Sequence, residues 1–166
     1  MRNLVAAPVI LLAVIIQSAV VSRIYLLSGI ADLPLVMLAA WALQEEVNTA
    51  WQWAVATGLL VGFVSGIAWF VPVISYLIVV VFAQLLQKRV WQAPLLAMFV
   101  VTFLGTIVLY LLSFATLRLS GVPLPLNDTL GLLGLPGVLL NMLLAIPAYA
   151  VMRDLSRWVH PSSEVE

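Results

Sequence analysis

The placement of the charged residues constrains this chain more than any other feature of its sequence. Four stretches contain no Asp, Glu, Lys or Arg: residues 3–22, 47–87, 90–117 and 129–152. A helix that crosses the hydrocarbon core of a bilayer needs about 20 apolar residues, and 47–87 is long enough for two such helices. The chain is therefore predicted to be an all-α, multi-pass membrane protein.

Composition excludes the other broad classes of protein. Charged residues make up 8% of the chain and hydrophobic residues 64%, whereas an average soluble domain is roughly 25% charged. A soluble or disordered chain needs far more polar surface than this. A net charge of zero predicts no nucleic-acid binding. The lack of cysteine and the single histidine predict no metal or thiol site.

The charge-free stretches predict five membrane-spanning helices, and a sixth lies between Asp32 and Glu45. The charge-free core of the sixth, 33–44, is short for a full crossing, so it crosses only if both of its ends reach the interface. Pro34 stands where the first turn of a helix tolerates proline. The six predicted helices span about 4–22, 31–46, 50–68, 71–87, 93–116 and 131–152. All six are placed in a single transmembrane domain, 1–166.

Lysine and arginine predict the orientation, because they are enriched in cytoplasmic loops. With six crossings, Arg23 and Arg118 lie on the outer side, and five basic residues share the side of the N-terminus. These five are Arg2, Lys88, Arg89, Arg153 and Arg157. Both termini are then cytoplasmic. If 31–46 does not cross, the N-terminus moves outside, and the C-terminus remains cytoplasmic.

Small residues recur every four positions in the third predicted helix. They are Ala50, Ala54, Gly58, Gly62 and Gly66. Lipid gives helices no hydrophobic reason to associate, so close approach of their backbones at small residues takes over that role. The stripe therefore predicts a close contact between helices. The contact lies either inside this chain or with a transmembrane helix of another protein.

A few polar side chains interrupt the predicted helices. Gln17, Gln84 and Asn141 are amides within apolar segments, and an amide in hydrocarbon needs a hydrogen-bond partner. We expect Asn141 to join helices, with contact to a substrate as the alternative. Asp32 is expected to stabilise the start of the second helix through the helix dipole, and Arg23 to pair with it.

Nothing in the sequence predicts catalysis. The chain contains no Gly-x-Ser-x-Gly motif and no pair of carboxylates in mid-membrane. No predicted helix carries a charge at its centre, which argues against ion pathways and proton relays. We therefore expect a protein that is not an enzyme and has no cofactor.

Several motifs, in order along the chain, resemble the MreD family of small membrane proteins of the bacterial rod-shape machinery. They are Ile16-Gln17, the run Ala31-Asp32-Leu33-Pro34-Leu35-Val36, the element Gly62-Phe63-Val64-Ser65-Gly66 after Gly58, and the closing Asn141…Pro147…Tyr149 helix. The resemblance covers nearly the whole chain. The chain departs from the family at two places: Ala31 replaces a proline, and no Asp follows Gly66.

The resemblance implies a non-catalytic scaffold of the cell-elongation machinery in the bacterial cytoplasmic membrane. MreD-like proteins associate with the bitopic partner MreC. Through MreC they connect to a peptidoglycan glycosyltransferase–transpeptidase pair and to the actin-like MreB filament. Membrane lipid surrounds them. The implied fold is similar to the six-helix substrate-binding components of energy-coupling-factor vitamin transporters.

Two other functions remain open. The first is the substrate-binding subunit of a vitamin or small-molecule transporter. That class typically has an Ala-x-x-x-Ala motif in its first helix, and the alanines of the first helix here include no pair four residues apart. The second is a structural, lipid-facing protein without a specific partner. For the scaffold, the residues predicted to pack against helices or a partner are Gln17, Ala54, Gly58, Gly62, Gly66 and Asn141.

Overall fold

The chain folds into apolar helices, as the sequence predicts. The computed structural model describes residues 6–19, 21–23, 29–44, 47, 49–88, 93–123, 125 and 134–159. Within these residues there are six α-helices, one short 3-10 helix and no strand. The helices are α1 (Ala6–Ala19), η2 (Val21–Arg23), α2 (Leu33–Ala42), α3 (Ala50–Ser65), α4 (Phe70–Gln87), α5 (Pro94–Leu119) and α7 (Leu135–Val159). The all-α prediction is confirmed for this part of the chain.

Three of these helices are long and apolar enough to cross a membrane: α4, α5 and α7. The other three, α1, α2 and α3, are apolar but shorter. The ten residues of α2 rise about 15 Å, against a hydrocarbon core of about 30 Å. These helices are consistent with the predicted membrane protein.

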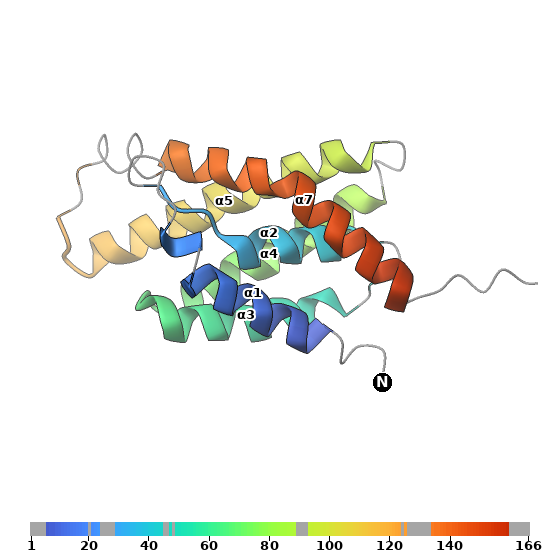
Figure 1. Ribbon diagram of the computed structural model, residues 1–166. Coiled ribbons are helices and arrows are strands. Elements are labelled where there is room, and N and C mark those ends of the chain that lie inside the picture. Colours follow the sequence, from blue (N-terminus) through green and yellow to red (C-terminus); the bar gives the residue numbers. More distant parts are fainter. Residues whose placement is uncertain are drawn as a thin grey trace, which may run out of the picture.

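The shortest helix, α2, lies at the centre of the bundle. Figure 1 shows α1 and α3 on one side of α2 and α5 and α7 on the other, and α2 contacts all five of the other α-helices. Eight of its ten residues are buried. A helix that is apolar all round belongs in an interior, and this explains why the least polar segment of the chain occupies this place.

Local sequence explains where several helices begin and end. Pro34 lies in the first turn of α2, where its missing N–H costs nothing, and Asp32 caps that turn. Gly66 ends α3 in a left-handed conformation, with φ of 69°. Arg118 lies in the last turn of α5, where a cation is favoured by the helix dipole.

The predicted helix ends need correction. α1 ends at Ala19 and α3 at Ser65, each three residues before the predicted end, because a 3-10 turn follows α1 and Gly66 stops α3. α5 continues to Leu119 and α7 to Val159, beyond the predicted ends at 116 and 152. α2 is shorter than 31–46 at both ends, because Asp32 caps its start and the helix ends at Ala42, before Leu43 and Gln44. The predicted ends at 4–5, 45–46 and 131–133 lie outside the described residues.

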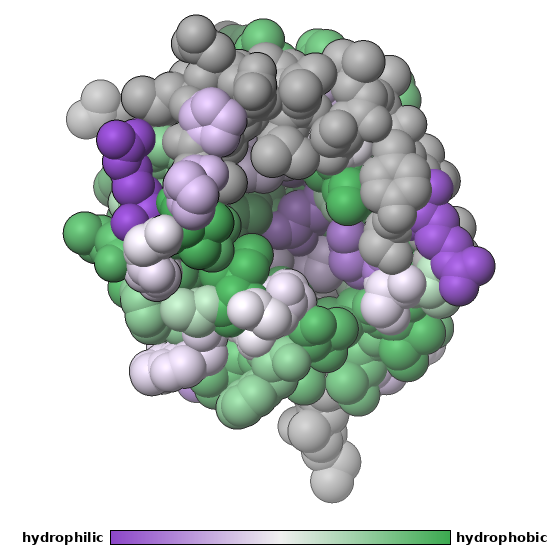
Figure 2. Space-filling model, turned by 90° about the vertical axis from the view of Figure 1, so that its left-hand side faces the viewer, coloured by the Kyte–Doolittle hydropathy of each residue, from purple (hydrophilic) through white to green (hydrophobic). Residues whose placement is uncertain are grey.

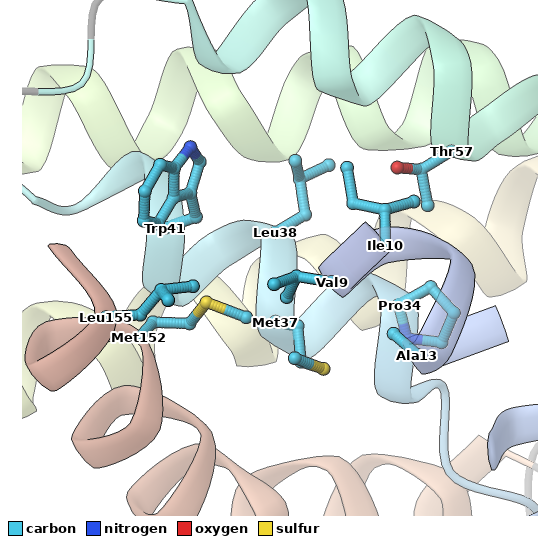
Figure 3. A pocket seen from close by; sticks show the side chains of 10 residues that line it. All are labelled: Val9, Ile10, Ala13, Pro34, Met37, Leu38, Trp41, Thr57, Met152 and Leu155. Atoms are coloured by element: carbon cyan, nitrogen blue, oxygen red, sulfur yellow. The ribbon is translucent and has the colours of Figure 1, made fainter. Parts of the chain in front are cut away.

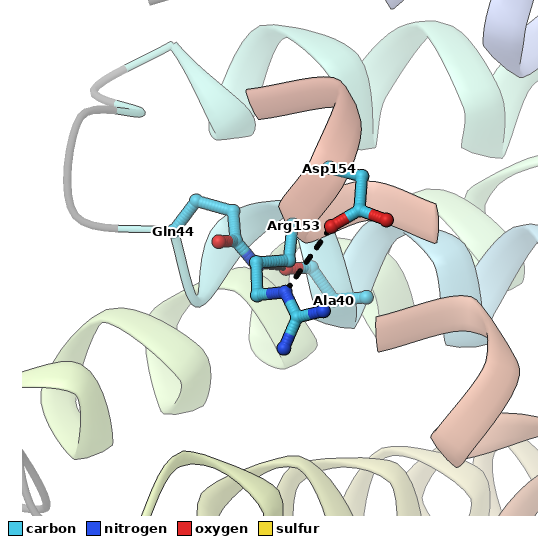
Figure 4. Close-up of polar contacts among 4 residues, drawn as sticks. All are labelled: Ala40, Gln44, Arg153 and Asp154. Atoms are coloured by element: carbon cyan, nitrogen blue, oxygen red, sulfur yellow. Dashed lines mark hydrogen bonds and ion pairs between the residues drawn. The ribbon is translucent and has the colours of Figure 1, made fainter. Parts of the chain in front are cut away.

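The extension of α7 has a simple physical basis. Met152, Ser156 and Val159 are buried on one face, while Arg153 and Asp154 are exposed and form an ion pair with Nε–Oδ1 of 3.3 Å. A helix can therefore continue past the apolar stretch, with its charges directed outward. Figure 4 shows this pair near the end of α2.

Proline divides α7 into two halves. Pro147 lies inside the helix, where it removes one backbone hydrogen bond and clashes with the preceding turn. Figure 1 shows that α7 is bent along its length. The bend lets one continuous helix follow the curved side of the bundle around α2.

Candidate functional site

The polar residues of the apolar segments meet at one place, the start of α2. We call this group the α2 cap network. It consists of Gln17 from α1, Asp32 before α2, Tyr76 from α4, Thr106 and Tyr110 from α5, and Asn141 from α7. Residues that are up to 109 positions apart in the chain are joined in it by direct hydrogen bonds.

The carboxyl group of Asp32 receives hydrogen bonds from two elements. Its Oδ1 accepts from the backbone N–H of Leu35 at 3.0 Å, which is the cap of α2. The hydroxyl of Tyr76 donates to the same carboxyl group, at 3.0 Å from each of its oxygens. Tyr76 is fully buried, and a buried tyrosine hydroxyl requires a partner. Asp32 therefore ties α2 to α4.

Asn141 bridges three elements. Its Oδ1 accepts from the backbone N–H of Asp32 at 2.6 Å, and its Nδ2 donates to Oγ1 of Thr106 at 2.9 Å. The Thr106 hydroxyl in turn donates to the carbonyl oxygen of Thr102 at 2.7 Å. Asn141 and Thr106 are both fully buried. The expectation that Asn141 joins helices is confirmed, since it links α7 to α5 and to the start of α2.

Gln17 holds the same segment from the other side. Its Nε2 donates to the carbonyl oxygen of Ala31 at 2.7 Å, and its Oε1 accepts from the N–H of Leu33 at 2.8 Å. The Tyr110 hydroxyl donates to the carbonyl oxygen of Ile30 at 3.3 Å. The side chains of α1 and α5 thus bond to backbone groups that belong to no helical ladder.

These bonds satisfy the beginning of α2 completely. The first N–H groups of a helix have no partner within the helix. Here Gln17 accepts from Leu33, Pro34 has no N–H, Asp32 Oδ1 accepts from Leu35, and the N–H of Val36 bonds to the Asp32 carbonyl. Non-helical backbone at membrane depth is tolerated only where protein groups replace water. The network provides that replacement.

Close backbone contact supports the network. A Cβ on Gly29 would lie 2.8 Å from Cβ of Pro136, at the start of α7. Gly137, in the next position of α7, leaves room for the Tyr110 ring, and a side chain there would collide with the Tyr110 hydroxyl. The hydrogen bond from Tyr110 to Ile30 therefore depends on the glycine in α7.

The predicted ion pair between Arg23 and Asp32 is wrong. Arg23 is exposed, and among the described residues no ion pair joins it to Asp32. The acceptors of Asp32 are directed at Leu35 and Tyr76 instead. Asp32 does lie at the start of the helix, where its side chain caps α2 directly by accepting from the N–H of Leu35.

The stripe of small residues packs inside the chain. Ala50, Ala54, Gly58 and Gly62 are buried. A Cβ on Gly58 would lie 2.6 Å from Cα of Val73, and a Cβ on Gly62 would lie 2.7 Å from Cα of Trp69. Gly66 is exposed at the end of α3. α4 therefore occupies the surface that the sequence offered as a dock for another protein's helix.

Sequence reasoning missed three members of the network. Tyr76, Thr106 and Tyr110 lie within apolar stretches and were not predicted as site residues. The two tyrosines could have been predicted, because the hydroxyl group of a tyrosine in a buried helix needs a hydrogen-bond partner. In the part of the chain that the structure describes, no three metal-binding side chains come together.

What the network can do chemically follows from these contacts. Its donors and acceptors face one another or the backbone of residues 30–35, so the network holds the start of α2 in a fixed position. It fixes α2 against four other helices, and it leaves apolar side chains to form the outer faces of α3, α4, α5 and α7.

No protein-family model, curated protein or solved structure matches this chain.

Proposed function

We propose that this protein is a non-catalytic membrane scaffold of the bacterial cell-elongation machinery, of the MreD type. In this proposal it lies in the cytoplasmic membrane with six crossings and both termini in the cytoplasm. It binds a bitopic MreC-like partner there. Through that partner it helps to organise the peptidoglycan glycosyltransferase–transpeptidase pair along actin-like MreB filaments.

One observation carries the proposal. Three of the residues on which the resemblance to MreD rests, Gln17, Asp32 and Asn141, converge on the start of α2. They come from α1, from the cap of α2 and from α7, so three motifs of the resemblance contribute to the same structural role. That role is the positioning of helices, which is what a scaffold requires.

The glycine stripe of α3 is covered within the chain, so a partner has to bind at another surface. α4 covers Gly58 and Gly62, whereas Trp51, Phe63 and Val64 of α3 are exposed and apolar. A partner helix in the membrane therefore meets bulky side chains on the outer face of α3 or of another helix. Association there depends on packing of shapes and on van der Waals contact.

The test is co-purification from bacterial membranes. A tagged chain, extracted in mild detergent, is expected to bring down an MreC-like bitopic protein in stoichiometric amount, identified by mass spectrometry. The matched control is a tagged, unrelated multi-pass protein of similar size. Purification of the intact, folded chain without a stoichiometric companion would contradict the scaffold proposal and favour a purely structural, lipid-facing protein.

A single observation supports a second candidate, the substrate-binding subunit of a small-molecule transporter. Figure 2 looks at the end of the bundle where α2 begins, and hydrophilic side chains lie at the bottom of a hollow there. Polar groups in a recess at one end of a bundle suit a small polar ligand. Tight binding of a vitamin by the purified chain, measured by calorimetry, would select this function over the scaffold.

A further inference from the structure

The middle of α7 contains a backbone acceptor that its own helix does not use. In an α-helix each carbonyl oxygen accepts from the N–H of the residue four positions later. Pro147 has no N–H, so the helix leaves the carbonyl oxygen of Leu143 without this partner. Among the side chains that the structure describes, none donates to that oxygen.

This carbonyl group lies on the outer side of the bundle. A helical carbonyl oxygen lies next to the nitrogen of the residue four positions later, on the same side of the helix. Pro147 is exposed, and the side chain of Leu143 is 70% exposed. The ring of a proline also pushes the preceding turn away, which opens the helix at this point. The oxygen is therefore accessible from outside, where α7 is bent (Figure 1).

Large aliphatic side chains lie beside this acceptor on the same face of α7. They are three or four residues apart, which places them in one row along the helix. Each of them is more than half exposed. The row, which we call the α7 ridge, consists of Leu135, Leu139, Leu143 and Ile146. From Leu135 to Pro147 this face is about 18 Å long, enough for about three turns of a second helix.

The outer faces of the other helices have no equivalent acceptor. Those of α3, α4 and α5 are also apolar. In the helices that the structure describes, however, every proline except Pro147 lies among the first three residues, where no carbonyl of the same helix is four residues earlier. These prolines are Pro8, Pro34, Pro72, Pro94 and Pro136. The freed carbonyl thus distinguishes α7 from the other apolar faces.

The inner face of α7 is occupied by the bundle itself. The pocket between α1, α2, α3 and α7 is lined mainly by apolar side chains, and its volume of about 20 Å³ suits about one water molecule. Figure 3 shows Met152 and Leu155 of α7 directed toward α2 at this pocket. A partner therefore has to bind α7 from outside.

We propose that the α7 ridge binds the single transmembrane helix of a bitopic partner, and that a hydroxyl or amide side chain of this helix donates to the Leu143 carbonyl. In hydrocarbon no water competes for the acceptor, so a donor on a neighbouring helix is its natural partner. Eight residues of α7 precede Leu143, and nine separate it from Arg153. In the proposed topology, the donor therefore lies near the middle of the partner's apolar segment. This inference rests on the proposed scaffold function and assigns the surface that the partner uses.

Photo-crosslinking in bacterial membranes tests the location of the site. In the tagged full chain, Leu143 is replaced by p-benzoylphenylalanine. In the matched control the same replacement is made at Val81, which is an exposed apolar residue of α4. We expect an adduct between position 143 and the companion that co-purifies with the wild-type chain, and no such adduct from position 81.

Pro147→Ala tests the freed carbonyl, because alanine supplies the missing N–H to Leu143. The affinity of the purified companion for the chain, titrated in detergent micelles, is expected to fall about three- to tenfold, the value of one interhelical hydrogen bond. Pro94→Ala is the matched control and should leave the affinity unchanged, because Pro94 is exposed but lies at the first position of α5.

Leu139→Ala tests the α7 ridge separately, since it shortens an exposed side chain and leaves the bend of α7 in place. It should also weaken binding of the companion. The α7 site is overturned, and the scaffold proposal stands, if the companion gives no adduct with position 143 or binds Pro147→Ala and Leu139→Ala as tightly as the wild-type chain. A wild-type chain that brings down no companion overturns both.

Discussion

At the scale of single residues, the decisive feature is that each polar side chain at the start of α2 has a specific partner. Asp32 accepts from Leu35 and Tyr76, and Asn141 accepts from the backbone of Asp32 while it donates to Thr106. In hydrocarbon there is no water to replace a lost partner. Removal of one member therefore leaves the other unpaired, and this cost exceeds the value of the bond itself.

Tyr76→Phe removes only the hydroxyl that donates to Asp32, so the two residues should be energetically coupled. We expect Tyr76→Phe to lower the free energy of unfolding by about 1–3 kcal/mol. In an Asp32→Ala background the same change should cost much less. The free energies come from unfolding the four proteins of this double-mutant cycle with a denaturing detergent.

Tyr110→Phe provides the control for this cycle, because the Tyr110 hydroxyl donates to Ile30 and not to Asp32. Its effect should be nearly the same with and without Asp32→Ala. Equal coupling of both tyrosines to Asp32 would show that the effect is not specific to the observed bond.

At the scale of elements, α3 and α4 pack through glycine, and α2 is held through hydrogen bonds. The backbones of α3 and α4 approach closely at Gly58 and Gly62. In a membrane such contacts gain van der Waals energy that larger side chains would prevent. The two contacts are thus different in chemistry and can be weakened separately.

Gly58→Ala should destabilise the α3–α4 contact, because the new Cβ would meet the backbone of Val73, which cannot move alone. Overpacking of this kind costs about 1–3 kcal/mol. Ala56→Leu, a larger change on the exposed face of the same helix, should be close to neutral. Melting temperatures in detergent check both expectations, and equal melting temperatures for the Gly58→Ala and wild-type chains would refute the close contact.

The sequence predicted the positions of the helices better than it predicted the contacts between them. The long charge-free stretches identified five of the six helices, because the cost of a charge in lipid dominates where a helix can lie, and the sixth was expected between Asp32 and Glu45. Their ends differ from the prediction by up to seven residues, at the end of α7, since ends depend on caps such as Asp32, on the conformation of Gly66 and on which side chains a neighbouring helix buries. Gln17 and Asn141 were singled out individually as polar groups that need partners.

The partners themselves were not predictable. Asn141 bonds to a backbone group 109 residues away, and Tyr76 to a side chain 44 residues away. Which groups meet at such separations depends on how the helices pack, and helical periodicity carries no information about it. The same limit applied to the glycine stripe, where spacing predicted a close contact but not the identity of α4 as the neighbour.

At the scale of the whole molecule, the proposed topology, with six crossings and both termini in the cytoplasm, predicts which loops face outward. The chain contains no cysteine, so single introduced cysteines report their own side of the membrane. In intact cells, a membrane-impermeant maleimide should label Ser120→Cys, after α5, but neither Lys88→Cys, after α4, nor Asn3→Cys. Labelling of Asn3→Cys would mean that α2 does not cross, and labelling of Lys88→Cys would contradict the proposed orientation.

The α2 cap network holds the central helix in place for the whole bundle. Hydrogen–deuterium exchange of the wild-type and Asn141→Ala chains in detergent tests it most directly. We predict that Asn141→Ala speeds exchange in residues 32–42 by about tenfold or more, as expected for a loss of at least about 1.4 kcal/mol. Exchange in the α3–α4 pair should be nearly unchanged. An unaltered rate in α2, or an equal increase in all helices, would contradict the claim.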